Sequence, residues 1–199
     1  MLQCGSPMTH FFIKDSRQKY RFFSSEQEKD LTIQVSRTKK IWEQAKKKLL
    51  LLPPRLLSQE QAFIGVSKSA EESVPIVYAA CHSEKRLRFR FAFFLQKQRS
   101  KHILLLLGES ILVPISGLAA LLPGPNILFY VLALLMITQW QALRGINRLV
   151  HKKHEFHPSS AFSEWEDAVA AEEEASYLQI LQRLEAEYRL ARLNRILWK

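Results

Sequence analysis

Residues 103–146 read ILLLLGESILVPISGLAALLPGPNILFYVLALLMITQWQALRGI, and this stretch decides the predicted fold. The tetrapeptide PGPN divides it into two apolar runs, at about 103–122 and 127–146. Each run of about 20 residues makes ~30 Å of helix, which is the thickness of a bilayer's hydrocarbon core. Neither run carries a continuous polar face, as a helix at the surface of a soluble protein would. The stretch therefore predicts a two-helix transmembrane hairpin.

The predicted turn of this hairpin covers residues 123–126. Pro123 and Gly124 stop the first helix, and Pro125 or Asn126 starts the second. The turn carries no charge. We expect it to lie on the far side of the membrane from both ends of the hairpin.

Both flanks of the hairpin are basic. The segment EKRLRFRFAFFLQKQRSKH (84–102) precedes it, and RGINRLVHKKHEFHPSS (144–160) follows it. The positive-inside rule then places both flanks on the cytoplasmic or matrix side. A single span would leave strong positive charge on both faces of the membrane, and two spans avoid this.

Lys and Arg outnumber Asp and Glu by 29 to 19, which gives a formal net charge of +10. In residues 84–102 the cations alternate with phenylalanines, a pattern typical of a nucleic-acid surface or of an amphipathic helix at a membrane surface. The apolar run that follows favours the membrane. We therefore expect an anionic lipid bilayer as the partner, and no nucleic acid.

The rest of the chain shows weaker patterns. We interpret residues 1–30 as a mobile tail, and residues 31–84 as a small mixed region with strands at 31–36 and 73–81 and helices at 38–52 and 56–67. Residues 163–199 look like one long amphipathic helix, because acidic residues crowd its first half and arginines its second. Ser163 and Glu166 would form its capping box. Its apolar seam would pack on the rest of the chain or in a homodimer, and consists of Tyr177, Leu181, Leu184, Tyr188 and Ala191.

The predicted fold class is therefore mainly α: a two-helix transmembrane hairpin, a small α/β or α N-terminal region and a long C-terminal amphipathic helix. The domain boundaries expected are a tail at 1–30, a soluble region at 31–84, the basic-flanked hairpin at 85–155 and the C-terminal helix at 156–199.

Motifs of soluble enzymes are missing from the sequence. It contains no GxxxxGK[ST], GxGxxG, GxSxG or HExxH, and no Cys/His set with zinc spacing. Cys4 and Cys81 form no framework, so we expect reduced thiols without a function. His151, His154 and His157 recur every three residues, which we interpret as a basic interfacial segment on a helix. We expect no enzyme, no cofactor and no metal site.

Glu109 is the one carboxylate within the apolar stretch. Intramembrane carboxylates are rare and tend to mark proton or cation paths. Glu109 lies ~9 Å from the basic end of its helix, where it would face Gln139 to Gln141. It can then pair with Arg144, a structural role, or take part in transport. Asn126 is a second polar candidate.

The hairpin resembles a known family, the mitochondrial potassium–proton exchange-related proteins and their bacterial relatives. The likeness is carried by Pro114 in LVPISGL, by PGPN with Phe129 and Tyr130 just after it, and by QWQALRG at 139–145. The upstream segment IWEQAKKKLLLLPPRLLSQEQ is similar to the family's Trp- and Lys-rich lead-in. The resemblance implies an inner-membrane protein linked to potassium–proton exchange, as a subunit or an accessory factor.

The leading hypothesis is an integral membrane protein involved in, or accessory to, monovalent cation–proton exchange. Its partners would be potassium and protons, and it would work as a homo-oligomer or in a membrane complex, because two spans seldom enclose an ion path. The location would be the bacterial or mitochondrial inner membrane, with both termini on the cytoplasmic or matrix side. Two rivals are a membrane-anchored scaffold that recruits a partner through its C-terminal helix, and a soluble RNA-binding protein that uses residues 85–102.

Overall fold

The computed structural model describes residues 8–25, 54–69, 72–118, 127–190 and 192–198. The chain forms two compact units. The first holds the N-terminal strands, residues 70–91 and the C-terminal residues from Lys152, and the second holds residues 63–69 and 92–151. The predicted strand at 31–36, the predicted helix at 38–52 and the turn of Pro123, Gly124, Pro125 and Asn126 lie outside the described residues.

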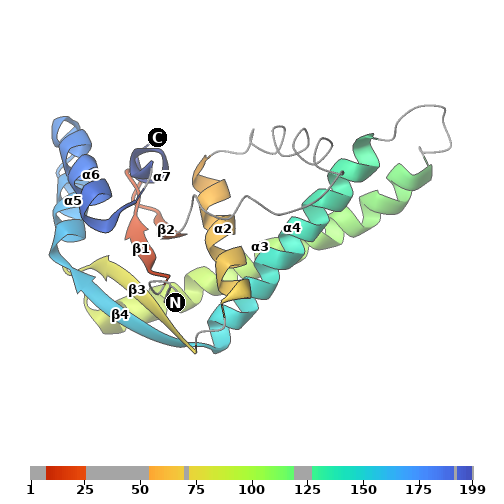
Figure 1. The fold of residues 1–199 in the computed structure, drawn as a ribbon, viewed down its shortest axis with the longest axis horizontal. Coiled ribbons are helices and arrows are strands. Elements are labelled where there is room, and N and C mark those ends of the chain that lie inside the picture. Colours follow the sequence, from red (N-terminus) through yellow and green to blue (C-terminus); the bar gives the residue numbers. More distant parts are fainter. Residues whose placement is uncertain (1–7, 26–53, 70–71, 119–126, 191, 199) are drawn as a thin grey trace, which may run out of the picture. The chain divides into compact units, whose positions relative to one another are not determined.

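The first unit is built on a four-stranded sheet (Figure 1). Its strands are β1 (His10–Lys14), β2 (Tyr20–Ser24), β3 (Ser73–Ala79) and β4 (Lys153–Ser159), in the order β2-β1-β3-β4. β1 and β2 form an antiparallel hairpin, whereas β1–β3 and β3–β4 are parallel. The sheet corrects the mainly-α prediction, because the protein is mixed α/β.

The predicted tail at 1–30 is also corrected, since residues 10–24 form the β1–β2 hairpin. Phe11, Phe12, Phe22 and Phe23 are fully buried, on both faces of the sheet. A strand covered on both faces has no alternation of apolar and polar residues. This is why a period-2 pattern did not reveal it.

One face of the sheet packs against α5 (Ser160–Ala170), α6 (Glu174–Tyr188) and α7 (Leu193–Leu197). The core there joins Phe11 and Val77 of the strands to Trp165, Leu181 and Leu197 of the helices. The other face packs against the first turns of α3 (Glu84–Leu118). There the ring of Phe91 lies 4.9 Å from that of Phe12 and 5.9 Å from that of Phe156.

The predicted single C-terminal helix is wrong, because three helices occupy this part of the chain. The breaks fall at residues in left-handed conformation, Glu172 (φ 57°), Arg189 (φ 52°) and Arg192 (φ 61°). None is a glycine or proline, so no local signal announced them. The N-cap of the first of these helices, α5, is Ser159 and not the predicted Ser163; the Ser159 side chain accepts a hydrogen bond from the Phe162 amide. The breaks let the apolar seam fold back onto the sheet.

The histidine-rich segment was expected to be helical: His151 is the last residue of a helix, but His154 and His157 lie in β4. β4 is the outermost strand beside β3, and its register pairs Ser73 with Lys153 and Ala79 with Ser159. The His154 ring meets the Phe91 ring edge-on at 5.2 Å. Pairing with β3 thus overrides the local three-residue period.

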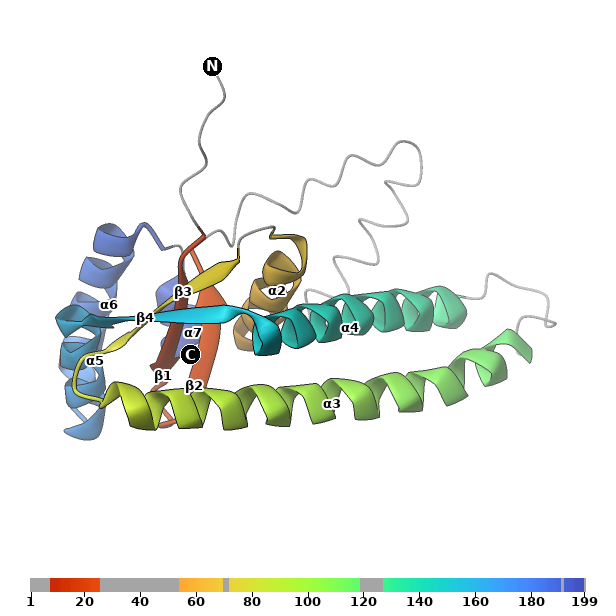
Figure 2. The same ribbon diagram turned by 90° about the horizontal axis from the view of Figure 1, so that it is seen from below.

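The second unit contains most of α3 and all of α4 (Ile127–His151), together with the end of α2 (Pro54–Lys68). α3 and α4 lie side by side and antiparallel (Figures 1 and 2). α2 and β3 confirm the helix predicted at 56–67 and the strand predicted at 73–81.

The transmembrane hairpin of the predicted fold class is corrected as well. Within the described residues, no helix is long and apolar enough to cross a membrane. α3 is one helix through the basic segment and into the apolar run, and it carries Lys101, Glu109 and an internal Pro114. The described part of the apolar run is therefore interrupted by charge.

Candidate functional site

Polar side chains form the seam between α3 and α4 of the second unit. His102 of α3 and Gln139 of α4 are both buried, and the imidazole Nδ1 is hydrogen-bonded to the Gln139 side-chain oxygen. The amide oxygen can only accept, so Nδ1 carries the proton. The Phe63 ring of α2 meets the imidazole edge-on at 6.3 Å.

The environment keeps His102 neutral. Burial lowers the pKa of His102, and the nearby Lys101 acts in the same direction, while the bond to Gln139 partly opposes them. The free ring nitrogen of a neutral imidazole can accept a proton, but burial disfavours the charged form that would result. The seam is therefore polar without being charged at this point.

Glu109 lies on the same face of α3, ~10 Å further along the helix axis. Its exposed fraction is 9%, and its Oε2 has no hydrogen-bond partner among the described residues. Burial raises the pKa of this carboxyl. The folded protein thus binds the Glu109 proton more tightly than a solvent-exposed glutamate would.

The opposite face of α3 is apolar and exposed. Leu104, Leu107 and Ile111 follow one stripe, and their exposed fractions are 72%, 59% and 65%. Ile103, Leu105 and Leu112 flank this stripe, and Ile137 and Trp140 of α4 are also exposed. From the level of His102 outward, the buried side chains that the structure describes are polar and most of the described α3 leucines are exposed, whereas nearer the basic end Leu95, Ala142, Ile146 and Leu149 are buried. We call Leu104, Leu107 and Ile111 the apolar stripe.

Cations gather at one end of the helical pair. Lys97, Arg99 and Lys101 of α3 are exposed, as is Arg144 of α4. The His102–Gln139 bond fixes the antiparallel register, so the Lys101 and Arg144 ends coincide, and the exposed Trp140 lies at the same level. Beyond this level the sequence has no formal charge except Glu109 until Arg144.

The structure places the predicted site residues differently from the sequence interpretation. Gln139 faces His102, so Glu109 lies about two turns away from the level of Gln139 to Gln141. Arg144 is exposed, and the ion pairs between described residues do not join it to Glu109. Asn126 and the turn prolines are outside the described residues.

Sequence reasoning missed His102 and Gln139 as partners. In the sequence His102 belongs to the basic flank at 84–102, and Gln139 is expected to face Glu109. A signal for His102 is present in the sequence: His102 and Glu109 are seven residues apart, which puts both on one face of a helix. The spacing can be read from the sequence, whereas identifying Gln139 as the partner requires the register between α3 and α4.

A separate group of side chains in the first unit has donor atoms suited to a metal ion. It consists of Cys81, His82 and Glu166, whose ligand atoms lie within 4.8 Å of one another. Cys81 and His82 follow β3, and Glu166 belongs to α5. No zinc spacing is visible in the sequence here, because Glu166 is far from the Cys-His pair along the chain.

Glu109→Gln should raise the stability of the protein at neutral and alkaline pH. The raised pKa means that the native state holds the Glu109 proton more tightly than the unfolded chain, so the wild type is favoured at acid pH and loses that advantage as pH rises through the native-state pKa. The neutral amide avoids a buried anion, which costs about 1–3 kcal/mol. Chemical denaturation between pH 4 and pH 8 measures this difference, and equal pH slopes for both proteins would contradict it.

The fold and the seam define a mixed α/β protein with an antiparallel helical pair that buries polar side chains in its seam and exposes leucines on α3. A family model described as mitochondrial K+–H+ exchange-related matches residues 34–152, more than half of the chain, and the chain belongs to this family. The resemblance found in the sequence is thereby confirmed. The match covers the seam residues and ends at the start of β4. No curated protein and no solved structure matches the chain.

Proposed function

We propose that this protein is a membrane-bound, non-enzymatic accessory component of potassium–proton exchange, seated on an anionic bilayer through the apolar stripe of α3. The observation that carries the proposal is the exposure of large apolar side chains on α3 at the level where polar side chains are buried. His102, Gln139 and Glu109 are buried while Leu104, Leu107 and Ile111 are exposed. The family description supplies the link to exchange.

The exposed leucines favour an apolar phase. Removing one large aliphatic side chain from water yields about 1.5–3 kcal/mol, and several such side chains are exposed together on α3. A contiguous apolar patch of this kind is typical of a membrane or protein interface.

The charges beside the stripe favour a bilayer with anionic headgroups over a second protein. Lys97, Arg99, Lys101 and Arg144 are exposed at one end of the pair, next to Trp140. Cations near a membrane surface gain about 1 kcal/mol each from anionic lipid, and tryptophan is enriched at the headgroup level. The family description leads us to assign the mitochondrial inner membrane, or the corresponding membrane of bacteria.

The polar seam supplies groups for handling protons or cations. His102, whose pKa is lowered, and Glu109, whose pKa is raised, are buried on one face of α3, and His102 contacts α4 through Gln139. Two helices seldom enclose an ion path, so we assign this seam to a homo-oligomer or to a membrane complex. If Glu109→Gln left potassium- and proton-coupled swelling of proteoliposomes unchanged, Glu109 would have no part in the exchange.

The rival functions receive less support. A scaffold that recruits a partner through the C-terminal helix needs a free apolar seam, but Tyr177, Leu181 and Leu184 are buried in the protein's own core. Nucleic-acid binding by residues 85–102 needs free stacking rings and cations. Phe89 and Phe93 are exposed, but Phe91 is buried in the core and the Arg90 guanidinium bonds the Tyr20 hydroxyl at 2.6 Å, so the segment offers only part of its rings and cations.

Vesicle flotation tests membrane binding through the apolar stripe. The full chain should float with vesicles that contain anionic lipid, and the double variant Leu104→Glu/Leu107→Glu should lose at least about tenfold in affinity, since two leucines that pass from water into the bilayer contribute several kcal/mol. Leu178→Glu is the matched control, because Leu178 is an exposed leucine of α6 in the other unit. Equal flotation of the double variant and the control would refute the proposal.

A further inference from the structure

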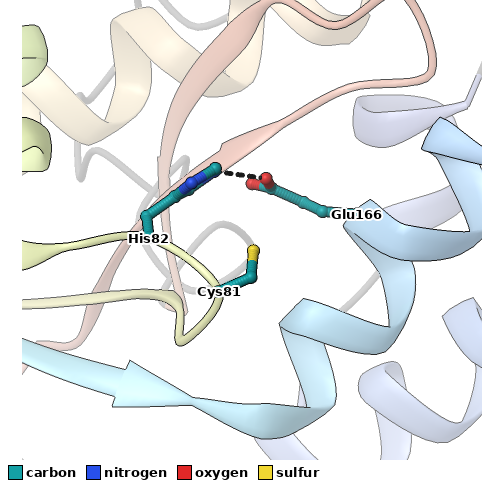
Figure 3. A group of neighbouring side chains, drawn as sticks. All are labelled: Cys81, His82 and Glu166. Atoms are coloured by element: carbon teal, nitrogen blue, oxygen red, sulfur yellow. Dashed lines mark hydrogen bonds and ion pairs between the residues drawn. The ribbon is translucent and has the colours of Figure 1, made fainter.

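We propose that Cys81, His82 and Glu166 form a site for a divalent transition-metal ion, with Zn²⁺ as the ion that the donor set fits best. Figure 3 shows the three side chains pointing toward one another from two elements. The proposal stands independently of the membrane function, because all three residues belong to the first unit.

The donor atoms are already gathered. His82 Nε2 lies 2.6 Å from Glu166 Oε2, and the Cys81 sulfur lies within 4.8 Å of one ligand atom of each of these two residues. Ligand atoms bound to one Zn²⁺ are ~3.3–3.6 Å apart, given bonds of about 2.0–2.3 Å in a tetrahedron. Small side-chain movements would therefore convert the hydrogen-bonded pair into a three-ligand site with one open position.

Hydrogen bonds hold the ligand-bearing segments in place. The Cys81 amide donates to Ser163 Oγ of α5 at 3.1 Å, and the Ala80 amide donates to the Ser159 carbonyl at 3.0 Å. Both bonds connect the loop after β3 to the segment that carries Glu166. The loop and the helix are thus fixed relative to each other before any ion binds.

The buried carboxylate is oriented in the same way. Glu166 Oε1 accepts a hydrogen bond from the Lys14 amide at 3.1 Å, which leaves Oε2 directed at His82. The adjacent Trp165 indole donates to the Lys14 carbonyl at 2.9 Å and fixes α5 against β1. Such outer contacts on a ligand are typical of metal centres.

The type of donor selects the ion. A thiolate and an imidazole beside one carboxylate suit Zn²⁺, whereas hard cations require oxygen ligands throughout. Potassium is therefore excluded from this site.

The Lys14 ammonium competes with a metal ion for the Glu166 carboxylate. The Lys14 ammonium lies 3.5 Å from Glu166 Oε2 and shares the carboxylate with His82. The metal would replace this cation, and Cys81 would lose its thiol proton to solvent as the sulfur–metal bond forms. Removing the Lys14 charge should therefore strengthen metal binding, a gain that damage to the fold would not produce.

Zn²⁺ and Co²⁺ binding to the reduced full-length protein tests the site. Chelator competition should give one Zn²⁺ per chain, and Co²⁺ should produce a thiolate-to-metal absorption band. Cys81→Ser should abolish the band, and Cys81→Ser and Glu166→Gln should each weaken Zn²⁺ binding by at least about tenfold. Lys14→Gln should tighten it by roughly threefold, because a competing charge is gone.

Two matched variants serve as controls. Cys4→Ser removes the other cysteine of the chain, and His157→Gln removes an exposed histidine of β4. Both should bind Zn²⁺ and Co²⁺ as the wild type does. Unchanged binding in Cys81→Ser, loss of binding in His157→Gln, or absence of the thiolate band in the wild type would each overturn the proposal. Cys81 is exposed, so its substitution leaves the core intact.

Discussion

Replacing Asp15 by alanine is expected to destabilise the first unit by about 3–5 kcal/mol, the usual loss when one partner of a buried ion pair is removed. Asp15 is fully buried at the turn between β1 and β2. Its Oδ1 accepts hydrogen bonds from the Arg17 and Lys19 amides, each at 2.9 Å, and its Oδ2 lies 2.8 Å from Arg21 Nη2. Alanine would leave a guanidinium and two amides without these acceptors.

Asp15→Asn separates the two roles of this side chain. The amide oxygen can still accept from the backbone of the turn, but the ion pair with Arg21 is lost, so we expect an intermediate destabilisation. Urea denaturation followed by far-UV circular dichroism measures the series. An alanine variant as stable as the wild type would show that the turn does not depend on Asp15.

The consequence of Asp15→Ala extends to the proposed metal site. β1 ends at Lys14, whose amide orients Glu166 and whose carbonyl accepts from the Trp165 indole. Loosening the turn should therefore also weaken Zn²⁺ binding, although Asp15 is not among the proposed ligands. Asp15→Asn should retain more of the metal affinity than Asp15→Ala.

Gly145→Ala is expected to destabilise the second unit by about 1–3 kcal/mol or more, as overpacking of a core does. Gly145 lies inside α4, where a Cβ would stand 1.8 Å from the Phe63 carbonyl oxygen and 2.6 Å from the Phe63 carbonyl carbon. These are backbone atoms of α2, which cannot rotate away. The two helices would have to separate, and the hydrogen bond from the Arg148 guanidinium to the Ser67 carbonyl would be lost with them.

Gly108→Ala provides the matched control, with the opposite sign. A Cβ at Gly108 of α3 meets nothing within 4 Å. Alanine should there stabilise the helix by about 0.5–1 kcal/mol, because glycine loses more backbone freedom on folding. Thermal unfolding of both variants checks the contrast, and stabilisation by Gly145→Ala would disprove the close approach of α2 and α4.

Some of the fold could be predicted from local pattern. The helix at 56–67 and the strand at 73–81 are present because Pro53 and Pro54 punctuate the chain and because Val, Ile and Tyr favour strands. The family resemblance came from the apolar stretch and is confirmed by the match to residues 34–152.

The β1–β2 hairpin and the β4 strand could not be predicted in the same way. Phe11, Phe12, Phe22 and Phe23 become strand residues because two layers of helix cover the sheet, and no local period records two covered faces. The breaks after α5 and α6 depend on left-handed residues that have no special identity. Tertiary packing offsets the conformational preference at each of these positions.

The candidate site residues also differ in whether the sequence alone could identify them. Glu109 could be recognised because a lone carboxylate within an apolar run can be read directly from the linear sequence. The pairing of His102 with Gln139 needed the register of two helices, and the cluster of Cys81, His82 and Glu166 needed a loop and a distant helix to meet. Neither arrangement has a spacing that sequence alone could show.

The sequence by itself determined the family, the basic character of the chain and the concentration of apolar residues in α3 and α4, because composition and hydrophobic runs are properties of the chain alone. The tertiary structure decided that the N-terminal phenylalanines form a sheet, that the C-terminal seam is buried on it, and that polar groups line the helical seam while leucines face outward. Burial depends on which surfaces meet, and segments far apart in the chain supply those surfaces.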